Sequence, residues 1–168
     1  MALSAMLAAL CYVTMLPLVG FYNVFLTLFI CFAAGVLVGP GWGFLTGVLG
    51  MFLCSYFNPL GAALPPIMLA QMLGAGISGL LGGLARRWAV SSRVNAVSLV
   101  AAGAFGLLTA LIYHLLVDIT DAWLWGPFWV RLQVGLASSL VTIISNIVIF
   151  IILFPVLKVV NGVLYGRR

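Results

Sequence analysis

The chain has 168 residues, of which 65% are hydrophobic and only 5% are charged. Soluble domains are about 45–50% apolar and about 25% charged, so this composition excludes a soluble globular fold, a soluble enzyme and a disordered chain. Seven Lys and Arg against two Asp and Glu give a net charge of +5. We therefore expect an all-α integral membrane protein.

Long apolar runs separated by short turn signals predict a compact bundle of six transmembrane helices. Each span needs about 20 mostly apolar residues, so six spans leave no room for a soluble domain, and residues 1–168 form one transmembrane domain. The expected helices are Ala2–Leu16, Asn23–Val38, Phe44–Phe57, Ile67–Trp88, Asn95–Val117 and a last one from Phe128 to Tyr165. Proline removes a backbone donor, so Pro155 is expected to kink or divide the last helix.

The connections between these helices are marked by Gly, Pro, Asn or charged residues. They are expected at Pro17–Asn23, Gly39–Gly43, Asn58–Pro66, Ala89–Val94 and Asp118–Pro127. Basic residues gather in one connection and at the C-terminal end: Arg86, Arg87, Arg93, Lys158, Arg167 and Arg168. This is the positive-inside pattern of a membrane protein rather than a nucleic-acid-binding surface, and it places both termini in the cytoplasm.

Polar and small residues follow one face of each of three expected helices, at steps of three and four. They are Gln71, Ala75, Ser78 and Gly82; Asn95, Ser98, Ala102, Thr109 and Tyr113; and Arg131, Gly135, Ser138, Thr142 and Ser145. Polar groups are costly against lipid, so these three faces are expected to meet. Either small residues and weak hydrogen bonds pack the helices together, or the faces enclose a ligand cavity that opens outward.

The residues that carry chemistry are few. Arg131 either binds an anionic ligand group, or pairs with Asp118 or Asp121, or extends to the lipid headgroups. A single His114 without a cysteine or carboxylate cluster is a weak signal for a metal or a catalytic base, and no catalytic or metal site is expected. The cysteines lie inside apolar runs as small packing residues; they are Cys11, Cys31 and Cys54.

Several motifs occur in a recognisable order along nearly the whole chain. They are the Ala-rich start with Ala5 and Ala9, the stretch Ala33–Gly43, the Gly-rich helix that ends in Arg86 and Arg87, Tyr113 with Asp118, and Asn146 with Phe154 and Pro155. In this order the chain resembles the substrate-binding membrane subunit, or S component, of energy-coupling factor (ECF) vitamin transporters. Such a subunit is not an enzyme.

The resemblance implies that the chain captures one vitamin or related micronutrient from outside with high affinity. It then docks on a transmembrane coupling subunit that carries two cytoplasmic ATPases, so ATP is used by the partners and this chain needs no cofactor. The implied pocket residues are Gln71, Tyr113, Asp118, Arg131, Ser138 and Thr142. Ala5 and Ala9 match the family's AxxxA motif, which contacts the coupling subunit. The implied location is the bacterial cytoplasmic membrane, with several passes through the bilayer.

Few charges in the presumed pocket favour a neutral or singly charged, partly aromatic ligand. Two other functions compete with transport. One is a membrane scaffold without a ligand, similar to the small six-helix subunit of bacterial cell-shape machinery, which a sealed interior would favour. The other is a membrane enzyme for lipid-linked substrates, which usually shows clustered Asp, Glu or His.

Overall fold

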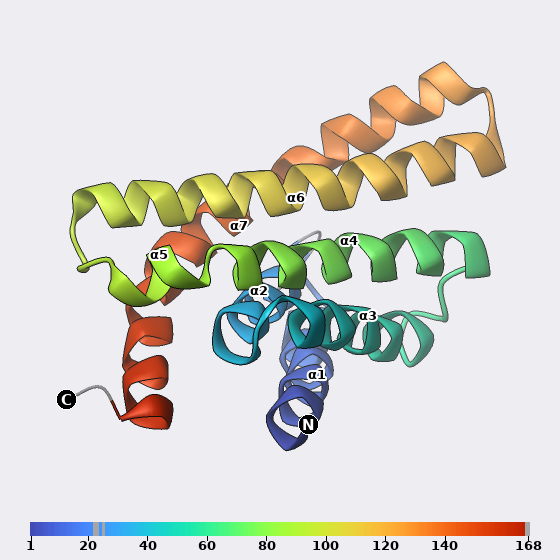
Figure 1. Ribbon diagram of the computed structural model, residues 1–168. Coiled ribbons are helices and arrows are strands. Elements are labelled where there is room, and N and C mark those ends of the chain that lie inside the picture. Colours follow the sequence, from blue (N-terminus) through green and yellow to red (C-terminus); the bar gives the residue numbers. More distant parts are fainter. Residues whose placement is uncertain (22–23, 25, 167–168) are drawn as a thin grey trace.

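The computed structural model describes residues 1–21, 24 and 26–166, which are mostly helical (Figure 1). The elements are α1 (Ala2–Met15), the 3₁₀ turn η1 (Leu16–Leu18), α2 (Thr27–Val38), α3 (Pro40–Tyr56), α4 (Pro65–Leu84), α5 (Arg86–Ser91), α6 (Ala96–Trp125) and α7 (Phe128–Tyr165). Within these described residues, α4, α6 and α7 are long and apolar enough to cross a membrane. The helical class is confirmed, and the count of six spans stays a prediction.

Two long helices, α4 and α6, run side by side and organise the fold (Figure 1). On one side α7 packs along α6, and on the other α3 and α2 pack against α4, with α1 against α3 and α2. Every residue of α2 from Thr27 to Leu37 is buried. A helix that is apolar on all sides is stable when other helices surround it, and α2 is packed against α1, α3, α4 and α7.

Two clusters of buried side chains hold the layers together. In the first, the ring of Phe150 from α7 lies 5.1 Å from Phe29 and 5.2 Å from Phe32, both in α2. The second joins α1, α2, α3, α4 and α6, and its members include Leu28, Met51 and Tyr113. The three cysteines are free thiols in this second cluster, where they pack as small apolar residues, as the sequence predicts.

Large apolar side chains also cover the outside of the bundle. On α6 and α7 the exposed members include Val97, Val100, Leu115, Val134, Ile144 and Ile152. Such a surface is unfavourable in water but matches the hydrocarbon of a bilayer, where backbone polar groups must be satisfied inside the helices. Both the apolar surface and the apolar core therefore indicate a membrane protein.

Glycines bring the backbones of α2, α3 and α4 into contact. A Cβ on Gly79 of α4 would overlap the carbonyl of Gly43 in α3, and one on Gly35 of α2 would overlap the carbonyl of Gly79. The hydroxyl of Ser78 donates to the carbonyl of Leu28 at 2.8 Å across the same interface. Close approach through small residues is a common way for membrane helices to gain packing energy.

Two helix boundaries near the middle of the chain differ from expectation. Helix α3 begins at Pro40 rather than Phe44, because Gly39 alone makes the turn at φ +94° and proline is favourable in the first helical turn. Helix α4 ends at Leu84 rather than Trp88, where Gly82 and Gly83 lower helix propensity, and the short α5 follows. The expected start at Asn23 lies outside the described residues.

The expected polar connection Asp118–Pro127 is wrong for most of its length, because α6 continues to Trp125. Asp118 and Ala122 in this part are buried against the neighbouring helices, and that burial outweighs the modest helix propensity of aspartate. At the other end, Asn95 caps α6 with a capping box that involves Ser98.

Helix α7 is assigned as one helix, with Pro155 inside it. Figure 1 shows that its red C-terminal part runs in a different direction from its orange N-terminal part. A proline inside a helix is the usual cause of such a kink, because it removes one backbone hydrogen bond and its ring displaces the preceding turn. The bend brings the end of α7 beside α5.

Candidate functional site

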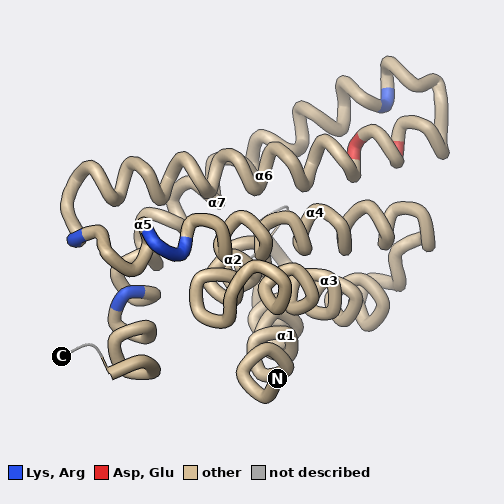
Figure 2. Tube along the Cα trace, in the orientation of Figure 1, with Lys and Arg blue, Asp and Glu red and all other residues tan. Residues whose placement is uncertain are grey.

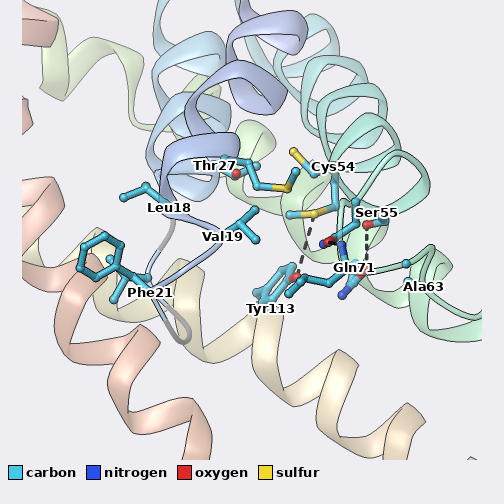
Figure 3. A pocket seen from close by; sticks show the side chains of 15 residues that line it. Leu18, Val19, Phe21, Thr27, Cys54, Ser55, Ala63, Gln71 and Tyr113 are labelled. Atoms are coloured by element: carbon cyan, nitrogen blue, oxygen red, sulfur yellow. Dashed lines mark hydrogen bonds between the residues drawn. The ribbon is translucent and has the colours of Figure 1, made fainter.

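A cavity of about 320 Å³ lies between the end of α1, the segment that follows it, the start of α2, α3, the α3–α4 connection, α4 and α6 (Figure 3). Residues from all of these elements form its wall. They are Met15, Leu18, Val19, Phe21, Val24, Thr27, Met51, Cys54, Ser55, Asn58, Leu60, Gly61, Ala63, Gln71 and Tyr113. None of these side chains is an acid, a lysine, an arginine or a histidine.

Gln71 from α4 and Tyr113 from α6 are neighbours in the cavity wall (Figure 3). The hydroxyl of Ser55 in α3 donates to Oε1 of Gln71 at 2.7 Å, which orients the amide. The hydroxyl of Tyr113 lies 4.0 Å from the sulfur of Met51. A Cβ on Gly74 would lie 2.9 Å from the Tyr113 ring, so this glycine makes room for the tyrosine. Both polar side chains are therefore held by their neighbours.

A second polar group lies buried between α6 and α7. The hydroxyl of Ser139 donates to Oδ2 of Asp118 at 2.6 Å and lies 2.7 Å from Nδ1 of His114. Nδ1 of His114 is 3.7 Å from Oδ1 of Asp118. A hydroxyl has one hydrogen, so Ser139 accepts at His114 when it donates to Asp118. Gly135 makes room for this group, because a Cβ there would lie 3.1 Å from Cγ of Asp118.

The structure brings together only part of the sequence-predicted pocket. Gln71 and Tyr113 line the cavity, whereas Asp118 belongs to the cluster with Ser139. Arg131 is exposed, and its guanidinium lies 3.7 Å from Oδ2 of Asp121. This ion pair is one of the alternatives that the sequence left open.

Ser138 and Thr142 belong to α7, and no part of α7 lines the cavity. The hydroxyl of Ser138 donates to the carbonyl of Gly135 at 2.8 Å, and Thr142 is fully buried with its carbonyl bound by Asn146 at 2.9 Å. The ligand contacts of all six residues stay predictions.

The cavity does not lie between the polar faces of α4, α6 and α7, where the sequence places it. The three polar faces were expected to enclose it, but α4 contacts α2, α3 and α6, while α7 packs on α6 (Figure 1). The polar face of α4 therefore meets α3 through Gln71 and α2 through Ser78. Periodicity identifies which residues share a face, but not which neighbour that face meets.

Sequence reasoning missed several polar residues of the two sites. Ser55, Asn58 and Thr27 line the cavity, and Ser139 joins His114 to Asp118. The only signal for Ser139 was that His114 and Asp118 lie four residues apart on one face of α6 and need a buried polar partner.

Helix α1 has an exposed face of small residues. Ala5 and Ala9 are exposed, whereas Ser4, Ala8 and Cys11 face the interior. The side chains of the exposed face leave the backbone of α1 open to close approach by another helix. This geometry is compatible with the docking role that the sequence resemblance implies for Ala5 and Ala9.

Ser139→Ala should lower the free energy of unfolding by about 1–3 kcal/mol, because it leaves the buried Asp118 without its hydroxyl donor. Thermal unfolding in detergent measures the change. Ser145→Ala is the matched control, since that hydroxyl donates to a carbonyl of its own helix. Equal effects of the two substitutions would show that the buried cluster adds no stability.

A helical bundle with a lipid-compatible surface and a small uncharged cavity defines a membrane-embedded ligand-binding protein. A family model described as ECF transporter, substrate-specific component, matches residues 1–160. The chain therefore belongs to this family, as its resemblance predicts. No curated protein and no solved structure shows significant similarity to it.

Family membership defines the general role of the chain. It is a multi-pass membrane protein and the substrate-binding subunit of an ECF transporter rather than an enzyme. Association with a membrane coupling subunit and ATPases follows from the same membership.

Proposed function

We propose that this S component binds a small neutral or singly charged, partly aromatic micronutrient, such as a vitamin, in the cavity of Gln71 and Tyr113. The observation that carries the proposal is that the described residues lining the cavity include no Asp, Glu, Lys, Arg or His. A multiply charged ligand would lose its hydration there without gaining an ion pair. The volume of about 320 Å³ is near the lower end for small-molecule sites, which favours a compact ligand.

The wall offers two kinds of contact to such a ligand. Met15, Met51 and Phe21 present flat or polarisable apolar surface, which suits an aromatic ring. Gln71 and Asn58 offer amide donors and acceptors for polar groups at the ring edge. A few polar groups in an apolar cavity reject analogues that leave them unpaired, and this supports a selective site.

The distribution of charge supports an outward-facing cavity in the bacterial cytoplasmic membrane. Figure 2 shows most of the basic residues near α5 at one end of the long helices, whereas both acidic residues and Arg131 lie near the opposite end. The cavity contacts Gln71, in the half of α4 that is farther from Arg86 and Arg87. Under the positive-inside rule the basic end is cytoplasmic, so the cavity belongs to the outer half.

Delivery then requires a coupling subunit and two cytoplasmic ATPases, which supply the energy. We assign the contact with the coupling subunit to the exposed face of α1 that carries Ala5 and Ala9. The cavity also argues against the alternative of a scaffold without a ligand, because a sealed interior would have favoured the scaffold. Ligand binding and docking involve different faces of α1, so they are separable by mutation.

Mass spectrometry of small molecules released from gently purified protein tests the proposal. One vitamin-like molecule per protein chain is expected. Gln71→Leu should weaken its binding about tenfold, because a polar edge of the ligand then lacks a partner. Gln133→Leu is the matched control, since Gln133 is exposed on α7 away from the cavity.

Two results would contradict the proposal. If no molecule co-purifies and a thermal-shift screen of vitamins gives no stabilisation, the scaffold becomes the better interpretation. If the bound molecule is a dicarboxylate, the proposal of a neutral or singly charged ligand is wrong even though the chain binds a ligand.

A further inference from the structure

Two side-chain amides, those of Gln71 and Asn58, line the substrate cavity, which is the cavity of about 320 Å³ proposed to hold the micronutrient. A side-chain amide has two unlike ends, because its oxygen accepts hydrogen bonds and its nitrogen donates two. The end that faces a ligand therefore decides which polar groups that ligand must carry. In both residues the protein itself already binds the oxygen end.

The amide of Gln71 is oriented by the end of α3. The hydroxyl of Ser55 donates to Oε1 of Gln71 at 2.7 Å, and Ser55 is buried (Figure 3). The position of Ser55 is itself fixed, since its carbonyl accepts from the backbone N–H of Ala63 at 3.0 Å. Nε2 of Gln71 carries two hydrogens, so one N–H stays available for a ligand even where the other points to the adjacent hydroxyl of Tyr113 (Figure 3).

The amide of Asn58 is oriented by the connection between α3 and α4. Its Oδ1 accepts from the backbone N–H of Leu60 at 2.9 Å, and its backbone carbonyl accepts from the N–H of Gly61 at 2.9 Å. A backbone N–H can only donate, so the end of the amide at Leu60 must be the oxygen. No acceptor among the described residues binds Nδ2 of Asn58, which leaves this amide nitrogen for a ligand.

The cavity therefore offers N–H donors from α4 and from the α3–α4 connection, and both are held in place before any ligand arrives. Carbonyl oxygens and ring nitrogens accept hydrogen bonds from such donors. An amino or ammonium group would instead face N–H with N–H, and it would lose its hydration without gaining a partner. Because the donors are already oriented, a ligand that matches them loses little free energy to ordering the site.

We infer that the substrate is a ring whose polar edge carries hydrogen-bond acceptors, and that Asn58 and Gln71 select it over rings that carry amino groups. This inference rests on the proposed function, since it concerns the same cavity. It narrows that proposal, because a singly charged cation is excluded and a ring with carbonyl oxygens or ring nitrogens is favoured. Ser55 and the turn at Leu60 contribute to specificity indirectly, because they bind the amide oxygens.

Thermal-shift titration of the full chain in detergent with two matched probes tests the inference. Quinazolinedione and diaminoquinazoline share one bicyclic ring, and the same two ring carbons carry carbonyl oxygens in the first and amino groups in the second. The wild-type protein should bind quinazolinedione at least about tenfold more tightly than diaminoquinazoline, because a site built for one hydrogen-bond pattern rejects an analogue that leaves it unpaired.

Asn58→Asp is the sharpest variant, because aspartate keeps an oxygen for the N–H of Leu60 and replaces the amide donors by an acceptor. The preference should reverse, with quinazolinedione bound about tenfold more weakly and diaminoquinazoline more tightly. Asn58→Ser removes the same donors without adding charge, keeps a hydroxyl oxygen for the turn, and should weaken quinazolinedione alone. Gln133→Glu is the matched control, since Gln133 is exposed on α7 outside the cavity, and it should keep the wild-type preference.

Equal affinity of the wild type for the two probes, or binding of neither, would overturn the inference. An unchanged preference in Asn58→Asp would overturn it as well. Equal changes in Asn58→Asp and Gln133→Glu would show that added charge, rather than the amide donor, selects the probe. The proposed function is judged separately by the molecule that co-purifies with the chain. If that molecule carries amino groups along its polar edge, the inference fails and the proposed function stands.

Discussion

Gly79→Ala is expected to lower the free energy of unfolding by about 2–3 kcal/mol or to prevent folding. The added methyl group would overlap the carbonyl of Gly43 in α3, and it cannot be accommodated by rotation of a flexible side chain. Helix α4 cannot simply move away, because it also packs against α2 and α6. The whole contact between these helices would have to open, with loss of packing along its length.

Gly162→Ala is the matched control for this experiment. Gly162 lies inside α7, and a Cβ there would meet no atom within 4 Å. Alanine is the better helix former, so this variant should be unchanged or up to about 1 kcal/mol more stable. Thermal unfolding of both variants in the same detergent provides the comparison. Similar stability of the two variants would mean that backbone contact at Gly79 is not what holds α3 and α4 together.

Ala9→Leu is expected to reduce assembly with the coupling subunit and substrate uptake about tenfold or more, while ligand affinity stays unchanged. Ala9 lies on the exposed face of α1 with Ala5, and a leucine there would hold an approaching helix away from the α1 backbone. The substrate cavity contacts α1 only through Met15, at the opposite end of that helix. Co-purification with the coupling subunit and ligand titration of the isolated chain measure the two effects.

Ala104→Leu is the matched control for docking, since Ala104 is exposed on α6 and carries no predicted role. It should assemble and transport like the wild type. If Ala9→Leu loses ligand affinity and assembly together, the substitution disturbs folding rather than docking. If it loses neither, the exposed face of α1 is not the contact with the coupling subunit.

The candidate site was only partly visible in the sequence. The family resemblance implies Gln71 and Tyr113 as pocket residues, and Gln71 is also costly near lipid without a partner or a ligand; both line the substrate cavity. The resemblance also implies Asp118 and Arg131 as pocket residues, but each has a partner within the protein: Ser139 for Asp118 and Asp121 for Arg131. A polar residue in an apolar segment indicates that something must satisfy it, not whether that partner is protein or ligand.

By itself the sequence determined the membrane class and the helical character, because both follow from its apolar composition. The family resemblance follows from the order of the motifs. The separation of basic and acidic ends follows from the cost of placing charge in lipid. Most predicted helix starts and ends lie close to those of the structure. The exceptions include the start of α3, where Gly39 makes the turn alone, and the end of α6, which extends past the buried Asp118.

Only the tertiary structure decided which faces meet. Polar residues of α4 turn to α2 and α3 rather than α7, so the cavity forms among Ser55, Gln71 and Tyr113. The reason is that period and hydropathy specify a face of each helix, whereas the partner of that face is chosen by close packing between helices, here by contact through Gly35, Gly43 and Gly79.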